Sequence, residues 1–264
     1  METTREKIRN NLPVEMTDVK QRETFKNFEF LQNNFVQFTG FRTWKNNGKW
    51  VPTGDIMQSH KISLIGLVNI FKYPLVVKDF GEPKSWQKGK RSESLQPGAF
   101  NLTIPCDIDE YRSIENIFCC TALMFDFEKS KVFSFNIIKE KLNALGFFWI
   151  GYSTYSNYKM TPDEKGGRFR IIIPLEKYIN PKIYFYACSN FLLDAGIAET
   201  TDNTLDMKDK GIDLSMFSPE HTSYMPVTAC EEYYFCEVSE SEKLYRFPEE
   251  MERIFLEKIY KYNN

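Results

Sequence analysis

The segment "LMFDFE", residues 123–128, constrains the fold more than any other part of the sequence. Side chains of a β-strand point alternately to its two faces, so Leu123, Phe125 and Phe127 would share one face. Asp126 and Glu128 would then lie together on the other face. Two carboxylates held this close repel each other unless a cation compensates them. The segment therefore predicts a strand with an apolar face for the core and an acidic face that needs a partner.

A second predicted strand, "RFRIII" at residues 168–173, shows the same alternation with the opposite charge. Arg168 and Arg170 would share one face, while the aromatic and aliphatic side chains occupy the other. If both strands lie in one sheet, the acids and the arginines open onto a common surface. Two interpretations remain open. Either the acids hold a divalent metal ion while the arginines grip phosphate oxygens, as a triphosphate site requires, or the four side chains form ion pairs on a solvated sheet face.

The segments around these strands predict an α+β fold with the order strand, helix, strand, strand, helix. A helix after Ser130 would be capped by that serine and end at Gly146, and a second helix would run from the cap Asn180 to Gly196. Pro174 is expected to close the third strand. The strands are predicted at residues 121–127, 147–154 and 168–175. We expect one sheet whose helices cover a single face.

The first half of the chain has a different texture. "WKNNGKW" predicts a hairpin around Asn47 and Gly48, and the apolar run at residues 62–71 fits a buried helix or a buried strand equally well. Residues 81–98 are rich in Pro, Gly and Ser and predict a long loop. This loop mixes basic and aromatic side chains, a combination that suits single-stranded DNA, although a merely solvated loop is the alternative. The residues concerned are Lys84, Trp86, Lys88, Lys90 and Arg91.

Composition narrows the classes of function. The formal net charge of −2 excludes a global basic field, so any nucleic-acid surface must be local. The chain has two histidines, His60 and His221, and its six cysteines form no C-x-x-C pair, which argues against a zinc site. No apolar run reaches the roughly 20 residues that span a bilayer. We expect a protein of the cytoplasm, without a membrane partner, that keeps its thiols reduced.

Taken in order, "LMFDFE", "YSTYSNYK", "GGRFRIIIPL" and "GIDLSMFSPEHTSYMPV" resemble the catalytic core of the archaeo-eukaryotic primase superfamily. The similarity is to the version found in primase-polymerases and replication proteins of phages and plasmids, and it covers about residues 121–227. The resemblance implies an α+β primase-polymerase core. Residues 121–264 would form a catalytic portion with an RRM-like sheet and a C-terminal helix. Residues 1–120 would form an N-terminal α/β portion, and together the two would enclose an active-site cleft.

The resemblance also implies roles for individual residues. Asp126 and Glu128 would be the first metal-binding pair and Asp213 the third acid, while Arg168 and Arg170 would contact the nucleotide. The second motif lacks the histidine that the superfamily often carries there, so its role would pass to the arginines or to a group of hydroxyl side chains. These hydroxyl residues are Ser153, Tyr155 and Ser156. The alternatives for the third acid are Asp202, Asp206 and Asp209.

The implied activity is that of a DNA primase or primase-polymerase, an enzyme that joins nucleotides on a single-stranded DNA template. It would use nucleoside triphosphates and two Mg²⁺ or Mn²⁺ ions, in the replication of a phage, plasmid or other mobile element. A replicative helicase, on another chain or on a domain missing from this sequence, would be a further partner. Two alternatives stay open: a replication-initiator or DNA-binding module that keeps the fold without catalysis, and a metal-dependent nuclease that uses the same acids.

Overall fold

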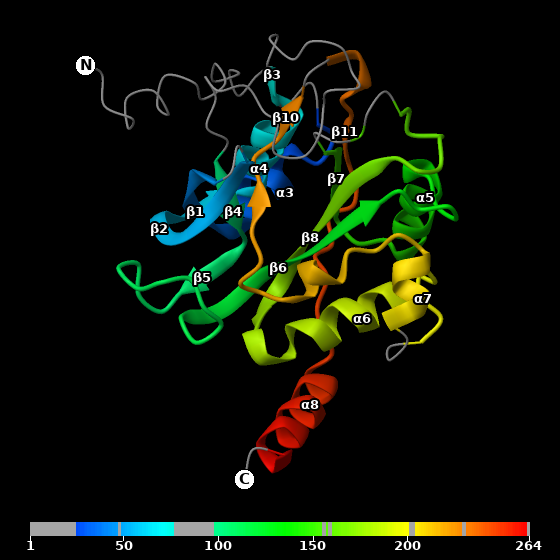
Figure 1. The fold of residues 1–264 in the computed structure, drawn as a ribbon. Coiled ribbons are helices and arrows are strands. Elements are labelled where there is room, and N and C mark those ends of the chain that lie inside the picture. The colour runs from blue at the N-terminus through cyan, green and yellow to red at the C-terminus, as the bar shows by residue number, and fades with distance from the viewer. Residues whose placement is uncertain are drawn as a thin grey trace, which may run out of the picture.

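A computed structural model describes residues 25–46, 49–76, 98–154, 157, 160–200, 204–228 and 231–262. It confirms the predicted α+β class and the order of strand, helix, strand, strand, helix in the second half (Figure 1). The strands are β1 (Phe35–Asn46), β2 (Lys49–Ser63), β3 (Leu75–Val76), β4 (Ala99–Asn101), β5 (Thr103–Pro105), β6 (Ile117–Glu128), β7 (Ile150–Ser153), β8 (Arg168–Ile179), β9 (Ser223–Tyr224), β10 (Val227–Thr228) and β11 (Cys236–Val238). The helices are α3 (Phe28–Asn33), α4 (Leu64–Lys72), α5 (Phe135–Leu145), α6 (Tyr184–Asp194), α7 (Thr204–Asp209) and α8 (Glu249–Tyr262), with short 3-10 turns η3 (Pro181–Ile183), η4 (Leu214–Phe217) and η5 (Glu231–Tyr233).

The strands form two larger sheets and one short pair. The five-stranded sheet has the order β11-β7-β8-β6-β5, and every neighbouring pair in it is antiparallel. The four-stranded sheet has the order β2-β1-β4-β9, and β3 pairs with β10 in parallel. Strands from both halves of the chain meet in each sheet, because β5 pairs with β6 and β9 pairs with β4. The two halves therefore build one structure around the strands that carry the acids.

Helices α5 and α6 of the second half cover one face of the five-stranded sheet, as predicted, whereas α4 of the first half packs on the opposite face, where its Phe71 stacks on Tyr152 of β7. Phe127 of β6 stacks on Phe169 of β8 with ring centroids 4.8 Å apart, and Phe135 of α5 meets Phe169 edge-on at 5.4 Å. Phe125 contacts Phe191 of α6 at 5.5 Å. Because side chains alternate along β6, the acids point to the opposite face. That face is turned toward α4 and the four-stranded sheet.

The N-terminal elements confirm the predicted hairpin and show that the apolar run at 62–71 is a helix. The β1–β2 pair is the predicted hairpin, although its turn residues Asn47 and Gly48 lie outside the described residues. The apolar run at 62–71 is a helix, α4, because Ser63 caps it by accepting a hydrogen bond from the Gly66 N–H. The predicted loop at 81–98 also falls outside the description, except for Gly98.

Two local predictions were wrong. Ser134, not Ser130, caps α5 by accepting from the Ile137 N–H, because the Ser130 hydroxyl is occupied in a turn directly after β6, where it accepts from Phe133. Pro174 does not end the third strand, since β8 continues to Ile179. The register of its partner β6 shifts between Cys120 and Ala122, and a proline, which lacks an N–H, is tolerated at such an irregularity.

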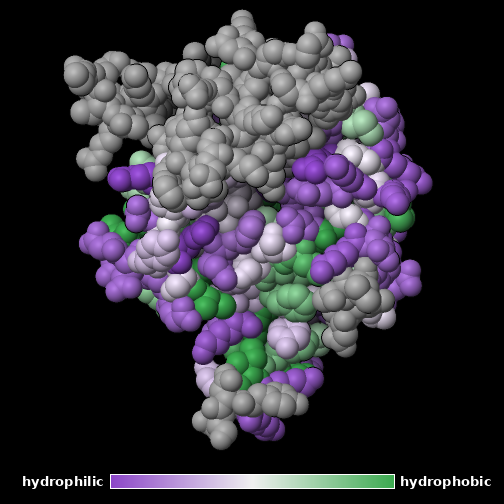
Figure 2. Space-filling model, in the orientation of Figure 1, coloured by the Kyte–Doolittle hydropathy of each residue, from purple (hydrophilic) through white to green (hydrophobic). Residues whose placement is uncertain are grey.

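The C-terminal helix α8 lies at the end of the molecule, red in Figure 1. Its Phe255 stacks on Tyr186 of α6 with ring centroids 4.2 Å apart, so the helix packs against α6. Figure 2 shows hydrophobic side chains gathered in this lower part of a face that is otherwise mostly hydrophilic. Within the ranges given above, no helix combines the length and apolar character needed to cross a membrane.

Candidate active site

The pairing of β6 with β8 brings acidic and basic side chains together on one face. Their register sets Asp126 opposite Arg170 and Glu128 opposite Arg168. Arg170 Nη2 donates to Asp126 Oδ2 at 2.5 Å, and the two side chains are only 9% and 10% exposed. Burial lowers the pKa of Arg170, but the neighbouring Asp126 and Tyr152 raise it further than burial lowers it, so it lies above its ordinary value. The guanidinium therefore stays charged inside the protein.

The second pair, Glu128 with Arg168, is more open. Arg168 Nη1 lies 3.2 Å from Glu128 Oε1, with the side chains 17% and 32% exposed. The backbone at Arg168 is fixed by Asn157, a buried side chain whose Oδ1 accepts from the Arg168 N–H at 2.8 Å. Both arginines are thus placed by the strand itself, and their outer ends approach solvent to different degrees.

Asp213 reaches the same region from a distant part of the sequence. Ile212 forms an antiparallel bridge with Phe127, which sets Asp213 opposite Asp126, and the Asp213 N–H donates to the Asp126 carbonyl at 2.9 Å. The Glu128 N–H donates to the Gly211 carbonyl at 2.7 Å. The third predicted acid therefore lies beside the first, on the edge of β6 away from β8.

Gly211 makes this close approach possible. Its φ of +80° lies in the left-handed region, and a Cβ at this position would stand 2.7 Å from the Ser130 Cα. After it, Asp213 caps η4 by accepting from the Ser215 N–H through Oδ1 at 3.0 Å. A residue with a side chain at 211 would push the whole segment, and Asp213 with it, away from β6.

The carboxylates differ in how fully their oxygens are used. Asp126 Oδ1 is buried and has no hydrogen-bond partner, although Oδ2 of the same group is paired with Arg170. An unpartnered buried carboxylate oxygen is unfavourable unless something binds it. Within the ranges that the structure describes, no three His, Cys, Asp or Glu side chains stand close enough to share a metal ion. The donor set nevertheless fits Mg²⁺ or Mn²⁺ in kind, since both prefer carboxylate oxygens.

Other predicted residues are not brought to this site. Ser153 pairs with Phe169, so its side chain points to the helix-covered face, where the hydroxyl accepts from the Phe235 N–H at 3.1 Å. Of the alternative third acids, Asp206 pairs with Lys210 at 2.9 Å and Asp209 is exposed. Several residues lie outside the described ranges, namely Asp202, Tyr155, Ser156, Lys84, Trp86, Lys88, Lys90 and Arg91.

Tyr152 was missed in the sequence, although it lies directly opposite Arg170 in the neighbouring strand β7. Its hydroxyl accepts from Arg170 Nη1 at 3.0 Å, and its ring stacks on Phe71 of α4 at 4.5 Å. Burial raises the pKa of Tyr152, with Arg170 acting in the opposite direction. Tyr152 therefore fixes Arg170 between β7 and Asp126. The sequence does contain a signal for it. In the predicted strand at 147–154, side chains alternate between the two faces, and Tyr152 points to the same face of the sheet as Arg170.

His221 was also given no role from the sequence, and it lies near the acids. Its Nε2 is 3.5 Å from Ser215 Oγ, two residues after Asp213. Partial desolvation lowers the pKa of His221; Asp213 and Asp126 raise it, while Arg170 and Arg112 lower it further. Charges from both sides of the site therefore act on this ring.

No protein-family model matches the chain, and no curated protein matches it. Two solved structures are similar to it. One is the AEP domain of the primase-polymerase of cyanophage S-2L, with 8% identity, a TM-score of 0.34, and coverage of 90% of this chain and 97% of that one. The other is the polymerase domain of Mycobacterium tuberculosis ligase D in complex with DNA, with 13% identity, a TM-score of 0.35, and coverage of 80% and 75%.

Proposed function

We propose that this chain is a nucleotidyltransferase, a DNA primase or primase-polymerase that joins nucleotides on a single-stranded DNA template. One observation carries the proposal. Two acids from distant parts of the chain, Asp126 and Asp213, are set side by side next to a buried arginine, and one oxygen of Asp126 is left without a partner. A sheet face that served only for ion pairing would need neither the second acid nor the spare oxygen.

Asp126, Glu128 and Asp213 would hold the divalent ions, Mg²⁺ or Mn²⁺. When bound, such ions neutralise phosphate charge and lower the pKa of the hydroxyl that attacks. Carboxylates suit this task because they are hard oxygen donors that stay ionised near neutral pH. Of the two acids of β6, Glu128 is the more exposed to solvent, with 32% of its side chain exposed against 10% for Asp126.

Arg168 and Arg170 would hold the triphosphate. In the free protein each is paired with an acid of β6, and a guanidinium can exchange that carboxylate for phosphate oxygens through its fork of donors. Tyr152 would hold the Arg170 side chain on this face during the exchange, because its hydroxyl accepts only from Nη1. The other guanidinium nitrogens would then be available to phosphate oxygens. The residues of the chain thus bind and orient the nucleotide and neutralise its charge.

The wider setting follows from the same proposal. The substrates would be nucleoside triphosphates and the template single-stranded DNA, with the basic segment around Lys84 and Arg91 contacting the template backbone. The reaction would serve the replication of a phage, plasmid or other mobile element in the cytoplasm of its host. A helicase on another chain would deliver the single strand.

The test is incorporation of labelled nucleotide on primed and unprimed single-stranded DNA with Mg²⁺ or Mn²⁺. Asp126→Asn keeps the size of the side chain and an oxygen that accepts from Arg170, but removes the charge, so incorporation should fall by about two orders of magnitude or more. The matched control is Asp206→Asn, in the other acidic segment, which should retain wild-type incorporation. Equal incorporation by wild type and Asp126→Asn would refute the assignment of the site.

One observation favours a second candidate, a DNA-binding module of the same fold without catalysis. Both acids of β6 are paired with arginines, which is also the arrangement that a purely structural sheet face would adopt. In the same assay this candidate predicts template binding without incorporation under any metal or nucleotide condition. Shortening of the template in the absence of nucleotides would instead identify a nuclease.

A further inference from the structure

A second group of basic side chains lies on the opposite side of the acids from Arg168 and Arg170. Those two arginines belong to β8, on one edge of β6, whereas Asp213 runs along the other edge. The chain continues from Asp213 through η4 to His221 and Thr222, and Thr222 Oγ1 accepts from Arg112 Nη1 at 2.8 Å. The charges of Asp213 and Asp126 act on the His221 ring, and so does the charge of Arg112, so His221 links the acids to Arg112 on this second edge.

Arg112 is held in this position by its own loop. The Arg112 N–H donates to the Gly54 carbonyl of β2 at 2.9 Å, and Tyr111 forms a bridge with Asp55. A Cβ at Gly54 would stand 2.0 Å from the Tyr111 ring, so only glycine lets the loop lie this close to β2. Asn116 closes the loop by donating to the Asp107 and Tyr111 carbonyls. These contacts hold the loop against β2 and fix the position of the Arg112 backbone.

The guanidinium of Arg112 has donors to spare. Its single side-chain hydrogen bond within the described ranges is the one to Thr222, and it forms no ion pair there. The carboxylate of Glu220 acts on it through space, with one buried oxygen that has no hydrogen-bond partner. Arg170, in contrast, is buried and uses both terminal nitrogens, Nη2 on Asp126 and Nη1 on Tyr152, while its buried Nε has no hydrogen-bond partner. Arg112 is therefore the more available guanidinium for an incoming anion.

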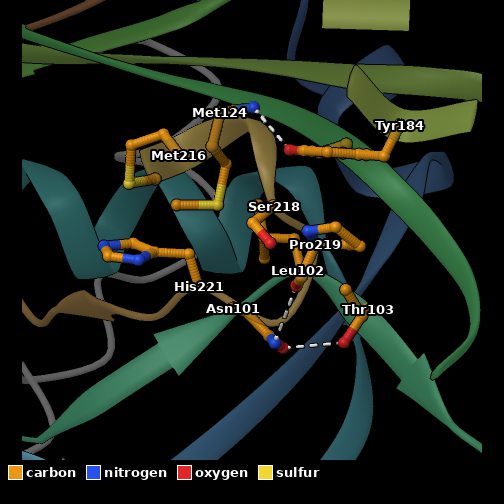
Figure 3. A pocket seen from close by; sticks show the side chains of 10 residues that line it. Asn101, Leu102, Thr103, Met124, Tyr184, Met216, Ser218, Pro219 and His221 are labelled. Carbon is orange, nitrogen blue, oxygen red and sulfur yellow. Dashed lines mark hydrogen bonds between the residues drawn. The ribbon is translucent and has the colours of Figure 1, made fainter. Parts of the chain in front are cut away.

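A small hollow lies on the side of β6 away from β8, between β6, residues 101–103 and residues 216–221 (Figure 3). Met124, two residues before Asp126 on the same face of β6, lines it together with Met216, Ser218 and His221. Its volume of about 10 Å³ is room for about one water molecule, so it is no pocket for a base. The ligand groups that this edge can take are consequently phosphates and sugars at the surface of the hollow, not a buried ring.

We propose that Arg112 and His221 bind phosphate of the strand whose 3′-hydroxyl attacks. The inference rests on the proposed function, in which Arg168 and Arg170 hold the triphosphate on the other edge. Joining two nucleotides requires two phosphate-bearing substrates to meet at the acids. Arg168 and Arg170 would serve the incoming triphosphate, and Arg112 and His221 would serve the strand. The phosphate has two sources, the backbone of a primer or the triphosphate of a first nucleotide in unprimed synthesis.

The test measures binding and needs no catalysis. Fluorescence anisotropy with a primed DNA template, without metal or nucleotide, should give an about tenfold weaker Kd for Arg112→Gln, which keeps a donor for Thr222 but loses the charge. The slope of log K against log salt should become shallower by about 0.7 to 0.9, and Arg112→Lys should restore it. Arg246→Ala, which removes an exposed arginine paired with Glu249 far from the acids, is the matched control and should behave as wild type.

A second arm separates the two sources. Titration with a fluorescent nucleoside triphosphate should show two sites in wild type and one in Arg112→Gln if the first nucleotide is the ligand, whereas the nucleotide sites stay unchanged if the primer is. The inference is overturned if Arg112→Gln matches wild type in both arms, whether or not wild type incorporates nucleotides. If wild type incorporates nothing but Arg112→Gln still weakens binding of the primed template, the phosphate site stands and the proposed polymerase function fails.

Discussion

The buried pair of Asp126 with Arg170 predicts that stability and activity separate in a double variant. Asp126→Leu alone leaves a guanidinium that is almost fully buried with Tyr152 as its remaining partner. Arg170→Met alone leaves the Asp126 carboxylate without any cation. Breaking a buried pair from one side costs roughly 3–5 kcal/mol, whereas replacing both partners by apolar side chains is often neutral. The double variant should therefore fold within about 1 kcal/mol of wild type and be inactive.

The magnitude follows from geometry. The two side chains are 9% and 10% exposed and meet at 2.5 Å, so water screens their interaction little. Losses of about 3–5 kcal/mol for each single variant and about 1 kcal/mol for the double variant correspond to a coupling free energy of about 5 kcal/mol or more. The neighbouring pair of Glu128 with Arg168 is the internal control. At 3.2 Å, with side chains 17% and 32% exposed, it should show a coupling of about 1 kcal/mol or less.

The assay is urea unfolding of wild type, the two single variants and the double variant, followed by tryptophan fluorescence. Trp149 is 2% exposed and lies in the same sheet region, so its emission should report loss of this core. Additive losses, with the double variant as unstable as the sum of the singles, would refute the view that the pair compensates itself. A stable double variant that still incorporates nucleotides would remove both residues from the catalytic site.

Three further predictions concern groups outside the acids. Burial, with a smaller effect of Cys106, raises the pKa of the Cys119 thiol to about 11 from an ordinary 9.0. Between these two pH values the folded state keeps a proton that the unfolded state loses. The free energy of unfolding should therefore fall as pH rises from about 9 to 11. In urea titrations at each pH, Cys119→Ala should lose less of its free energy of unfolding over that range than wild type. Among the described cysteines, iodoacetamide should modify the exposed Cys106 first and reach the buried Cys120 and Cys188 only after unfolding, as mass spectrometry of digests can show. Ser134→Ala should cost about 1 kcal/mol by removing the cap of α5, and Ser134→Asn should restore most of it in the same unfolding assay.

The alternation of side chains accounts for the part of the site that could be predicted from the sequence. A period of two places Asp126 and Glu128 on one face and Arg168 and Arg170 on one face, and each segment has only one apolar face to bury. Once both strands bury that face in the same sheet, acids and arginines must meet. Register remained open, because nothing local says that residue 126 faces 170 and not 168.

The position of Arg112 could not be predicted, because it depends on contacts between distant segments. Arg112 and Thr222 are 110 residues apart, and β5 and β9 are two or three residues long, too short to show any pattern. The choice between Ser130 and Ser134 as the helix cap failed for a related reason. Both serines precede the same apolar stripe, and only the turn after β6 shows that the first is already engaged.

The third acid gives the strongest argument against a purely structural sheet face, and it yields the last prediction. Asp126 has Arg170 and Glu128 has Arg168, but Asp213 lies beside Asp126 and forms no ion pair with any residue in the described ranges. An extra carboxylate next to a paired one is electrostatically unfavourable in the free protein. Asp213→Asn keeps the cap of η4, because Asn and Asp cap helices equally well, so it should stabilise the free protein by roughly 0.5–1 kcal/mol in urea unfolding. Under the proposed function the same change should abolish incorporation, since it removes a charged oxygen donor for the metal ions. A variant that is less stable than wild type and equally active would show that Asp213 serves the fold.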